Sequence, residues 1–335
     1  MTRKTMKKMM ATTLTMVMIG STALGSTAVF AADGASEKVE GAEGLNIGAT
    51  YYTLQTEFCM RMDNAAQKWA EENGVKYKSY DGNNDAATQL SQVETMIADG
   101  VDAIILNPQD ADACSACVDA ADEAGIPIIG VNTMVNNDKL TAYVGSQDVS
   151  AGEDIMKYMI DYMKKDAFNI VVIEGPMGQS AQLQRMEGIE NVLKDYPDIQ
   201  ILAKNTANWS RSEAMTLMET WITTYGDDID AVVSENDEMA LGAVEAYRKS
   251  EYVPSEWPVI FGIDGLDSAL EAVKSGEMQG TVYNDKEEQA LEMARLSLEI
   301  FRGENVYRSQ LKEGRYYVSQ YQRVDSSNVD DFLKH

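Results

Sequence analysis

The chain has 335 residues, of which 44% are apolar and 24% are charged, and both fractions are near the averages of globular proteins. A single hydrophobic core usually stops growing at about 250–300 residues, so this length predicts two domains. The one histidine is the last residue, His335, which excludes a Ser-His-Asp triad or a His-ligated zinc site in a packed pocket. The net charge of −26 argues against a nucleic-acid partner, because phosphate binding needs basic surface.

The N-terminus has the pattern of a secretory signal peptide. Four basic residues precede an apolar stretch over 9–23, and small residues follow it. We expect a signal peptide over 1–31 and a polar, flexible leader over 32–44. Loss of the four basic residues changes the net charge from −26 to −30. These features predict export to the periplasm or to the extracellular face of the cell envelope.

Three cysteines remain after this cleavage, namely Cys59, Cys114 and Cys117. The last two have C-x-x-C spacing, but they lie in an alanine-rich helical pattern and no second pair of metal ligands accompanies them. We therefore interpret them as small buried helix residues, and a locally oxidised pair is the alternative. No metal site and no cofactor site is predicted.

From residue 45 onward, short β-branched runs alternate with amphipathic stretches of helical periodicity. This alternation predicts right-handed βαβ crossovers and parallel sheets. Ten strands are too many for one comfortable open sheet, so we expect an α/β protein with two doubly wound lobes and a first break near Ser146. The predicted strands are 45–52, 75–80, 101–107, 126–132, 140–146, 168–175, 199–205, 229–236, 258–264 and 280–284. The predicted helices are 58–73, 86–98, 111–124, 149–165, 181–194, 211–225, 237–250, 266–275 and 286–302.

Amides, carboxylates, hydroxyls and aromatic side chains follow most of the predicted strands. Ligands of doubly wound sheets bind beyond the carboxyl ends of the strands. Amides and carboxylates can bond vicinal hydroxyls, and aromatic rings pack against the C–H faces of sugars. This set of residue types indicates a site for a small polyhydroxylated molecule, although each Asn or Asp could equally be a turn or helix-cap residue.

Four of these segments together resemble the periplasmic sugar-binding proteins of ABC transporters, the ribose- and galactose-binding branch that shares its core with LacI-type repressors. They are GVDAIILNPQDADAC (100–114), AGIPIIGVN (124–132), VSENDEMALGAVEA (233–246) and VIFGIDG (259–265). A repressor would need a basic DNA-binding segment before this core, and here a signal peptide and an acidic leader precede it. The resemblance implies a type I periplasmic binding protein fold, in which two lobes close over one ligand.

The resemblance also implies boundaries for the lobes and three hinge crossings between them. The N-terminal lobe is expected at 45–146 plus 285–314, and the C-terminal lobe at 147–284 plus 315–330. The hinges are expected near Ser146, Asp264 and Asn284.

Eleven residues match the ligand-binding positions of the family. They are Tyr52, Thr56, Phe58, Cys59, Asn132, Thr133, Arg185, Trp209, Asn236, Asp264 and Asn284. In this interpretation Arg185 and Asp264 bind ring and hydroxyl oxygens, although the two could instead form a salt bridge across the cleft. Many relatives carry an Asp-Arg pair where this chain has Asn132-Thr133, so the pocket should be less charged than a ribose site.

Two further pairs have assigned roles in this interpretation. Phe58 and Trp209 sandwich the sugar ring, with core packing as the alternative. Asn236 and Asn284 each offer a donor and an acceptor to the ligand, with helix capping as the alternative.

These features predict a monomeric, non-enzymatic solute-binding protein that delivers a sugar or polyol to an ABC transporter permease. One alternative is a receptor that presents a sugar-like signal to a sensor kinase or chemoreceptor. Another is a secreted carbohydrate-active enzyme, since glycosidases need only two carboxylates about 5–10 Å apart.

Overall fold

The computed structural model of the chain describes residues 39–304 and 316–333, so the predicted signal peptide, most of the leader and His335 lie outside the described residues. It contains two six-stranded sheets with the same strand order. The first runs β2-β1-β3-β4-β5-β11, with β1 Asn46–Tyr51, β2 Lys76–Asp81, β3 Ala103–Asn107, β4 Ile128–Asn132, β5 Ala142–Ser146 and β11 Tyr316–Ser319. The second runs β7-β6-β8-β9-β10-β12, with β6 Phe168–Glu174, β7 Ile199–Thr206, β8 Ala231–Ser234, β9 Val259–Asp264, β10 Gly280–Tyr283 and β12 Gln322–Val324.

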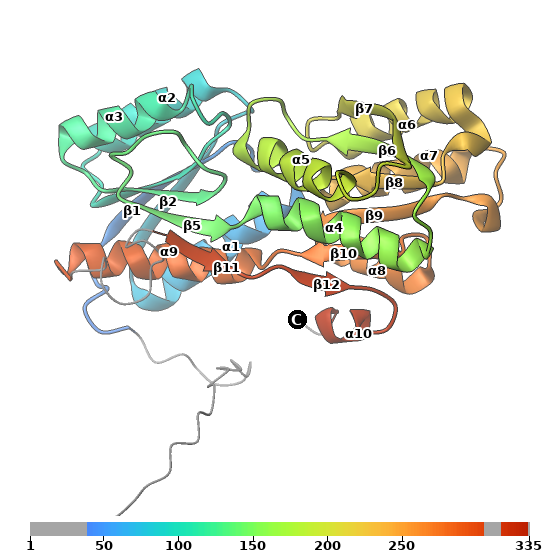
Figure 1. Ribbon diagram of the computed structural model, residues 1–335. Helices are drawn as coiled ribbons and strands as arrows, with labels where there is room; N and C mark the ends of the chain where they lie inside the picture. Colours follow the sequence, from blue (N-terminus) through green and yellow to red (C-terminus); the bar gives the residue numbers. More distant parts are fainter. Residues whose placement is uncertain (1–38, 305–315, 334–335) are drawn as a thin grey trace, which may run out of the picture. The chain divides into compact units, whose positions relative to one another are not determined.

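Helices cover both faces of each sheet (Figure 1). In the first lobe, α2 (Ala86–Ala98) and α3 (Ser115–Ala124) cover one face, while α1 (Glu57–Asn73) and α9 (Lys286–Phe301) cover the other. In the second lobe, α4 (Asp148–Met163) and α5 (Ser180–Leu193) pack together on one face. The remaining helices of this lobe are α6 (Arg211–Tyr225), α7 (Asp237–Lys249), α8 (Asp267–Ser275) and, near the C-terminus, α10 (Val329–Phe332). Short 3-10 turns occupy Gly226–Asp228 and Pro254–Glu256.

Burial explains why the apolar runs form the central strands. All five residues of β3 are buried, as expected for a strand covered by helices on both faces. Several helices begin at a polar strand-end residue that caps the backbone. The side chains of Asp85, Ser210 and Asp285 accept from the N–H groups of Thr88, Glu213 and Glu288, respectively. Capping therefore gathers polar side chains at the carboxyl ends of the strands.

The chain crosses between the lobes three times, and one crossing differs from the prediction. The first lies between Ser146 and α4, and the second between β10 and α9, near the expected Asn284. The third lies at 320–321, because β11 pairs with β5 in the first sheet and β12 pairs with β10 in the second. Asp264 is not a crossing, since β9 and β10 are neighbours in one sheet. The expected lobe boundary at 315 is likewise wrong, because β11 belongs to the first lobe.

Buried hydrogen bonds join the three crossings to one another. The Ser146 hydroxyl donates to Asn284 Oδ1 at 3.0 Å and lies 2.9 Å from the Ser319 hydroxyl. Gln289 Nε2 donates to the same Asn284 oxygen at 2.7 Å. All four side chains are buried. Ser146, Asn284 and Ser319 thus come from the three crossings, and Gln289 of α9 completes the shared cluster.

The described end of the predicted leader is attached to the first lobe. The N–H of Val39 donates to Asn73 Oδ1 at 2.7 Å, and Ala42 is fully buried. Residues 39–44 thus contact the first lobe, and the flexibility of the leader stays a prediction.

The three cysteines are buried and carry free thiols. Cys114 directly precedes α3, and its thiol donates to Gln89 Oε1 at 3.3 Å. This placement agrees with the interpretation of the C-x-x-C pair as small buried residues.

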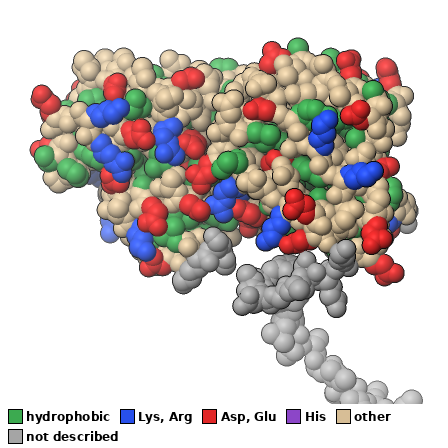
Figure 2. All heavy atoms as spheres, turned by 180° about the vertical axis from the view of Figure 1, so that it is seen from behind, with side chains coloured by type: hydrophobic (Ala, Val, Ile, Leu, Met, Phe, Trp, Pro, Cys, Tyr) green, Lys and Arg blue, Asp and Glu red, His purple; other side chains and the backbone are tan. Residues whose placement is uncertain are grey.

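Acidic side chains are spread over the face shown in Figure 2, with basic side chains among them. That face shows no continuous basic field of the kind that phosphate backbones require. Within residues 39–304 and 316–333, no helix is both long enough and apolar enough to span a membrane.

Candidate functional site

A pocket lies at the carboxyl ends of the strands and receives residues from both lobes. Its empty volume, open solvent included, is about 360 Å³. Twelve residues line it: Tyr52, Thr56, Phe58, Asn132, Thr133, Gln179, Ala181, Arg185, Trp209, Asn236, Glu238 and Asp264. Nine of the eleven residues selected from the sequence are in this set, and Cys59 and Asn284 are not.

The first lobe supplies three residues from the loop and helix that follow β1. Tyr52 and Phe58 are each 5% exposed, so their rings form an apolar wall. The Thr56 hydroxyl caps α1 by accepting from the N–H of Cys59 at 3.5 Å. Cys59 is fully buried beside Tyr52 and Thr56 rather than in the pocket wall. Its burial raises the pKa of the thiol to about 11, so Cys59 supports the wall as a neutral residue.

The end of β4 supplies Asn132 and Thr133. The Asn132 carbonyl accepts from the Tyr143 hydroxyl at 2.6 Å, which ties this strand end to β5. The Thr133 hydroxyl donates to the carbonyl of Pro108 at 2.8 Å. This part of the wall is therefore polar and uncharged, as the Asn-Thr pair in the sequence predicts.

Arg185 is the centre of a buried charged network in the second lobe. Its Nε donates to Asp148 Oδ1 at 2.9 Å, and its Nη1 donates to the carbonyl of Glu235 and lies 3.7 Å from Asp264 Oδ1. Its Nη2 donates to the Tyr321 hydroxyl at 3.5 Å, and that hydroxyl donates to Asp148 at 2.7 Å. Arg185 and Asp264 therefore form the ion pair that was the alternative to ligand binding, but both belong to the second lobe, so the pair does not span the cleft.

This network also reaches two of the crossings. Asp148 follows the first crossing, and Tyr321 lies within the third. Burial raises the pKa of Asp264 well above its ordinary value, and the nearby guanidinium of Arg185 acts in the opposite direction. Because Arg185 bonds to Asp148 and Tyr321, the position of its guanidinium in the pocket depends on residues of the hinge.

Trp209 forms the aromatic wall of the second lobe. Its indole N–H donates to Gln179 Oε1, and the Arg185 guanidinium lies 5.6 Å from its ring centre. A Cβ on Gly175 would lie 2.1 Å from the indole ring, so only glycine allows this approach. The ring is 4% exposed, and it faces Tyr52 and Phe58 of the first lobe as part of the same pocket lining.

Three pocket residues have backbone conformations that side chains rarely adopt. The φ angles are 61° at Asn132, 58° at Trp209 and 126° at Asp264. Such conformations cost about 1–3 kcal/mol each and cluster at ligand-binding sites. Asn132 and Asp264 end β4 and β9, and Trp209 lies in the loop after β7, so the strained positions are at the carboxyl ends of strands.

The two asparagines assigned to the ligand have different positions. Asn236 lines the pocket, and its Oδ1 also caps α7 by accepting from the N–H of Met239 at 2.9 Å. Its amide nitrogen is then the group available to a ligand. Asn284 is in the cluster that joins the crossings, where its Oδ1 accepts from Ser146 and Gln289. It is not among the lining residues, so its contact with a ligand stays a prediction.

The sequence interpretation missed Gln179, Ala181 and Glu238. Gln179 directly precedes α5 in the loop after β6, and no sequence motif marks it as a pocket residue. Glu238 follows Asn236 on the first turn of α7, so its position one turn beyond a strand end was the signal that could have identified it.

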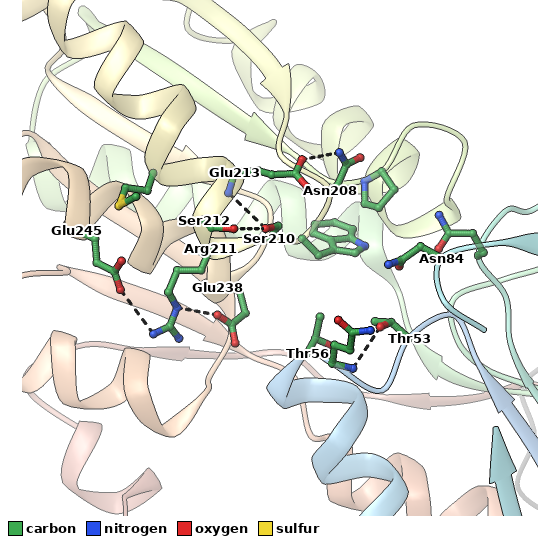
Figure 3. A pocket seen from close by; sticks show the side chains of 15 residues that line it. Thr53, Thr56, Asn84, Asn208, Ser210, Arg211, Ser212, Glu213, Glu238 and Glu245 are labelled. Atoms are coloured by element: carbon green, nitrogen blue, oxygen red, sulfur yellow. Dashed lines mark hydrogen bonds and ion pairs between the residues drawn. The ribbon is translucent and has the colours of Figure 1, made fainter. Parts of the chain in front are cut away.

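A wider groove lies outside the inner pocket and shares Thr56, Trp209 and Glu238 with it. Figure 3 shows the labelled side chains of both lobes around an open space. The groove has a volume of about 1420 Å³, open solvent included, and fifteen residues line it: Thr53, Gln55, Thr56, Asn84, Gln109, Pro176, Asn208, Trp209, Ser210, Arg211, Ser212, Glu213, Met215, Glu238 and Glu245.

The lobes touch each other on two sides of these cavities. On one side the N–H of Met134 donates to the Ser180 hydroxyl at 2.6 Å. On the other side Arg61 Nη1 lies 2.7 Å from Asp267 Oδ1, and the Ser268 hydroxyl donates to Glu57 at 3.3 Å. In this arrangement the inner pocket is enclosed by residues of both lobes.

This fold, with one enclosed pocket at the strand ends of two similar lobes, defines a cleft-binding protein of the α/β class. A family model described as "Periplasmic binding protein domain" matches residues 47–305. The chain belongs to the periplasmic binding protein family, which confirms the resemblance found in the sequence. The relatives described next are named as binding proteins rather than enzymes.

Two relatives and one solved structure illustrate the similarity. The xylitol-binding protein of Mycolicibacterium smegmatis is 37% identical over 94% of this chain and 86% of its own length. The ribose import binding protein RbsB of Bacillus subtilis is 32% identical over 72% of this chain and 76% of its own length. An ABC transporter solute-binding protein from Bacillus halodurans, solved with bound myo-inositol, has a TM-score of 0.79 and 31% identity. That similarity covers 88% of this chain and 99% of the solved chain.

Proposed function

We propose that this protein captures a neutral sugar or sugar-like polyol between its two lobes and delivers it to an ABC importer. The observation that carries the proposal is the composition of the inner pocket. Rings of Tyr52, Phe58 and Trp209 line it together with amide, hydroxyl and carboxylate side chains. Aromatic rings suit the C–H faces of a sugar, and the polar groups suit its hydroxyls.

The charges in the pocket support a neutral ligand. Arg185 is the one cation among the lining residues, and Asp148 and Asp264 already lie against it. The lining also contains the carboxylates of Asp264 and Glu238. An anionic ligand would therefore meet two carboxylates and a guanidinium that is already paired, which is unfavourable for sugar acids and sugar phosphates.

The names of the relatives agree with this class of ligand. The curated relatives are named for xylitol and ribose, and the solved relative holds myo-inositol, all of which are uncharged polyhydroxylated molecules. Delivery to an importer is supported by the printed descriptions of a ribose import protein and an ABC transporter protein. We place the protein outside the cytoplasmic membrane on the basis of the signal-peptide pattern over 1–31.

Thermal unfolding with a panel of pentoses, hexoses, pentitols and inositols tests the binding step. A ligand at 1,000 times its Kd stabilises the folded state by about 4 kcal/mol, which is a large shift in Tm. Calorimetry on each hit then measures Kd, and chromatography of the same mixture tests for turnover. Binding of a neutral compound without turnover is expected, whereas binding of charged sugars alone would refute the proposed class.

Uptake of the identified compound tests the delivery step. A strain that lacks this gene should lose high-affinity uptake of the radiolabelled compound and regain it on complementation. Uptake that is unchanged while a transcriptional response is lost would favour the sensory receptor instead.

A further inference from the structure

We propose that the wider groove outside the inner pocket is a second ligand subsite that holds a neutral hydroxylated substituent, such as a second sugar ring. The ligand would then be a glycoside or disaccharide rather than a free monosaccharide or polyol. This inference rests on the proposed function, because it specifies the ligand class of the same cleft.

The groove is continuous with the inner pocket. Thr56, Trp209 and Glu238 line both cavities, so a molecule seated in the pocket can extend past these three side chains. The pocket encloses about 360 Å³ and the groove about 1420 Å³, each with open solvent included. A substituent that passes these side chains enters the groove, which is open to solvent.

Three side-chain amides of the first lobe line the groove without protein partners. Gln55, Asn84 and Gln109 all face it, and within residues 39–304 and 316–333 none of these amides takes part in a hydrogen bond. The Gln109 Oε1 atom is buried and lacks a partner. A buried acceptor without a partner is uncommon and unfavourable, and a turn of the Gln109 side chain toward the groove would let a ligand donor satisfy it.

The charged residues of the groove are already paired with protein groups. Arg211 Nε donates to Glu238 Oε2 at 2.8 Å, and Arg211 Nη1 lies 3.9 Å from Glu245. The Glu213 carboxylate accepts from Asn208 Nδ2 at 2.7 Å (Figure 3). The groups left for a ligand are therefore uncharged donors and acceptors. The groove contains the carboxylates of Glu213, Glu238 and Glu245 but only the guanidinium of Arg211. This excess of negative charge also disfavours an anionic substituent such as a phosphate.

Calorimetry with matched pairs of compounds tests this subsite. Each pair consists of a free parent (xylitol, D-ribose, D-galactose or myo-inositol) and the same parent carrying one glucosyl or galactosyl residue. At least one glycosylated compound should bind about tenfold or more tightly than its parent, because the extra ring gains hydrogen bonds to the amides.

Substitutions then locate the gain in the groove. In the Asn84→Ala/Gln109→Ala variant, the ratio of the parent Kd to the glycoside Kd should fall to about 1. Asn83→Ala is the matched control, because Asn83 has a similar φ of 52° against 56° at Asn84 but bonds to Asp81 and does not line the groove. The ratio should stay at its wild-type value in this control. The single Asn84→Ala change, at an exposed site, gives the same test if the double variant unfolds.

Three results would overturn the inference, and they separate it from the proposed function. If parents bind and no glycoside binds more tightly, the groove is only an entrance, and the proposed function stands. If a glycoside gains affinity equally in wild type and in both Asn84 variants, the substituent lies elsewhere. If neither parents nor glycosides bind, both the subsite and the proposed function are wrong.

Discussion

Replacement of Arg185 by methionine should destabilise the folded protein as well as remove ligand binding. Methionine keeps much of the side-chain length, but it leaves Asp148 and Asp264 without their shared cation. Both aspartates are at most 5% exposed as whole residues, and the bond from Arg185 to Asp148 is 2.9 Å long. Loss of one partner from a buried charged network costs about 3–5 kcal/mol, because a buried charge remains uncompensated.

The loss of stability should depend on pH with a definite sign. Burial raises the pKa of Asp264, and Arg185 opposes this shift, so the variant should have a still higher Asp264 pKa. An ionised carboxylate with a raised folded-state pKa destabilises the fold above its unfolded pKa of about 4. The difference in the free energy of unfolding between wild type and Arg185→Met should therefore be largest at pH 7.5. It should be smaller at pH 4.5, where the Asp264 carboxyl is increasingly protonated in the folded and in the unfolded protein.

Urea denaturation at the two pH values measures this difference. Arg323→Met is the matched control, because Arg323 pairs with Asp154 and Asp161 at 3.2 and 3.3 Å but is 38% exposed. Exposed pairs contribute about 0–1 kcal/mol, so the control should stay within about 1 kcal/mol of wild type. An Arg185→Met variant that is as stable as the control, or whose loss is the same at both pH values, would refute this account of the network.

Three further outcomes are expected. Trp209→Ala should weaken binding of the identified sugar about tenfold to a hundredfold in calorimetry through lost stacking, and unchanged affinity would remove Trp209 from the site. Saturating ligand should reduce the radius of gyration in small-angle scattering, because the lobes close about crossings near Ser146, Asn284 and 320–321; a constant radius at demonstrated saturation would contradict the hinge. The intact mass of the exported protein should correspond to a chain that starts at Ala32, and a secreted chain that still starts at Met1 would contradict cleavage.

The sequence by itself determined the periodic elements and most of the candidate site. All ten predicted strands correspond to β1–β10, because alternating buried runs and amphipathic helices are local properties of the chain. The strand-end positions of Tyr52, Asn132 and Asp264 follow from parallel topology, which brings the carboxyl ends of the strands to one edge. The family resemblance contributed Arg185, which lies on α5 and not at a strand end.

Only the tertiary structure decided which groups meet across long sequence separations. The four residues of β11 pair with β5, and the three residues of β12 pair with β10. The position of the third crossing therefore depends on the sheet edge with which each of these short strands pairs. The same holds for Asn284, which bonds to Ser146 across 138 residues and so joins two of the crossings. The sequence around Asn284 or Ser146 does not indicate that these two residues are partners. Side-chain pairing of this kind follows from the packing of the two lobes, whereas strand and helix periodicity follows from the adjacent residues alone.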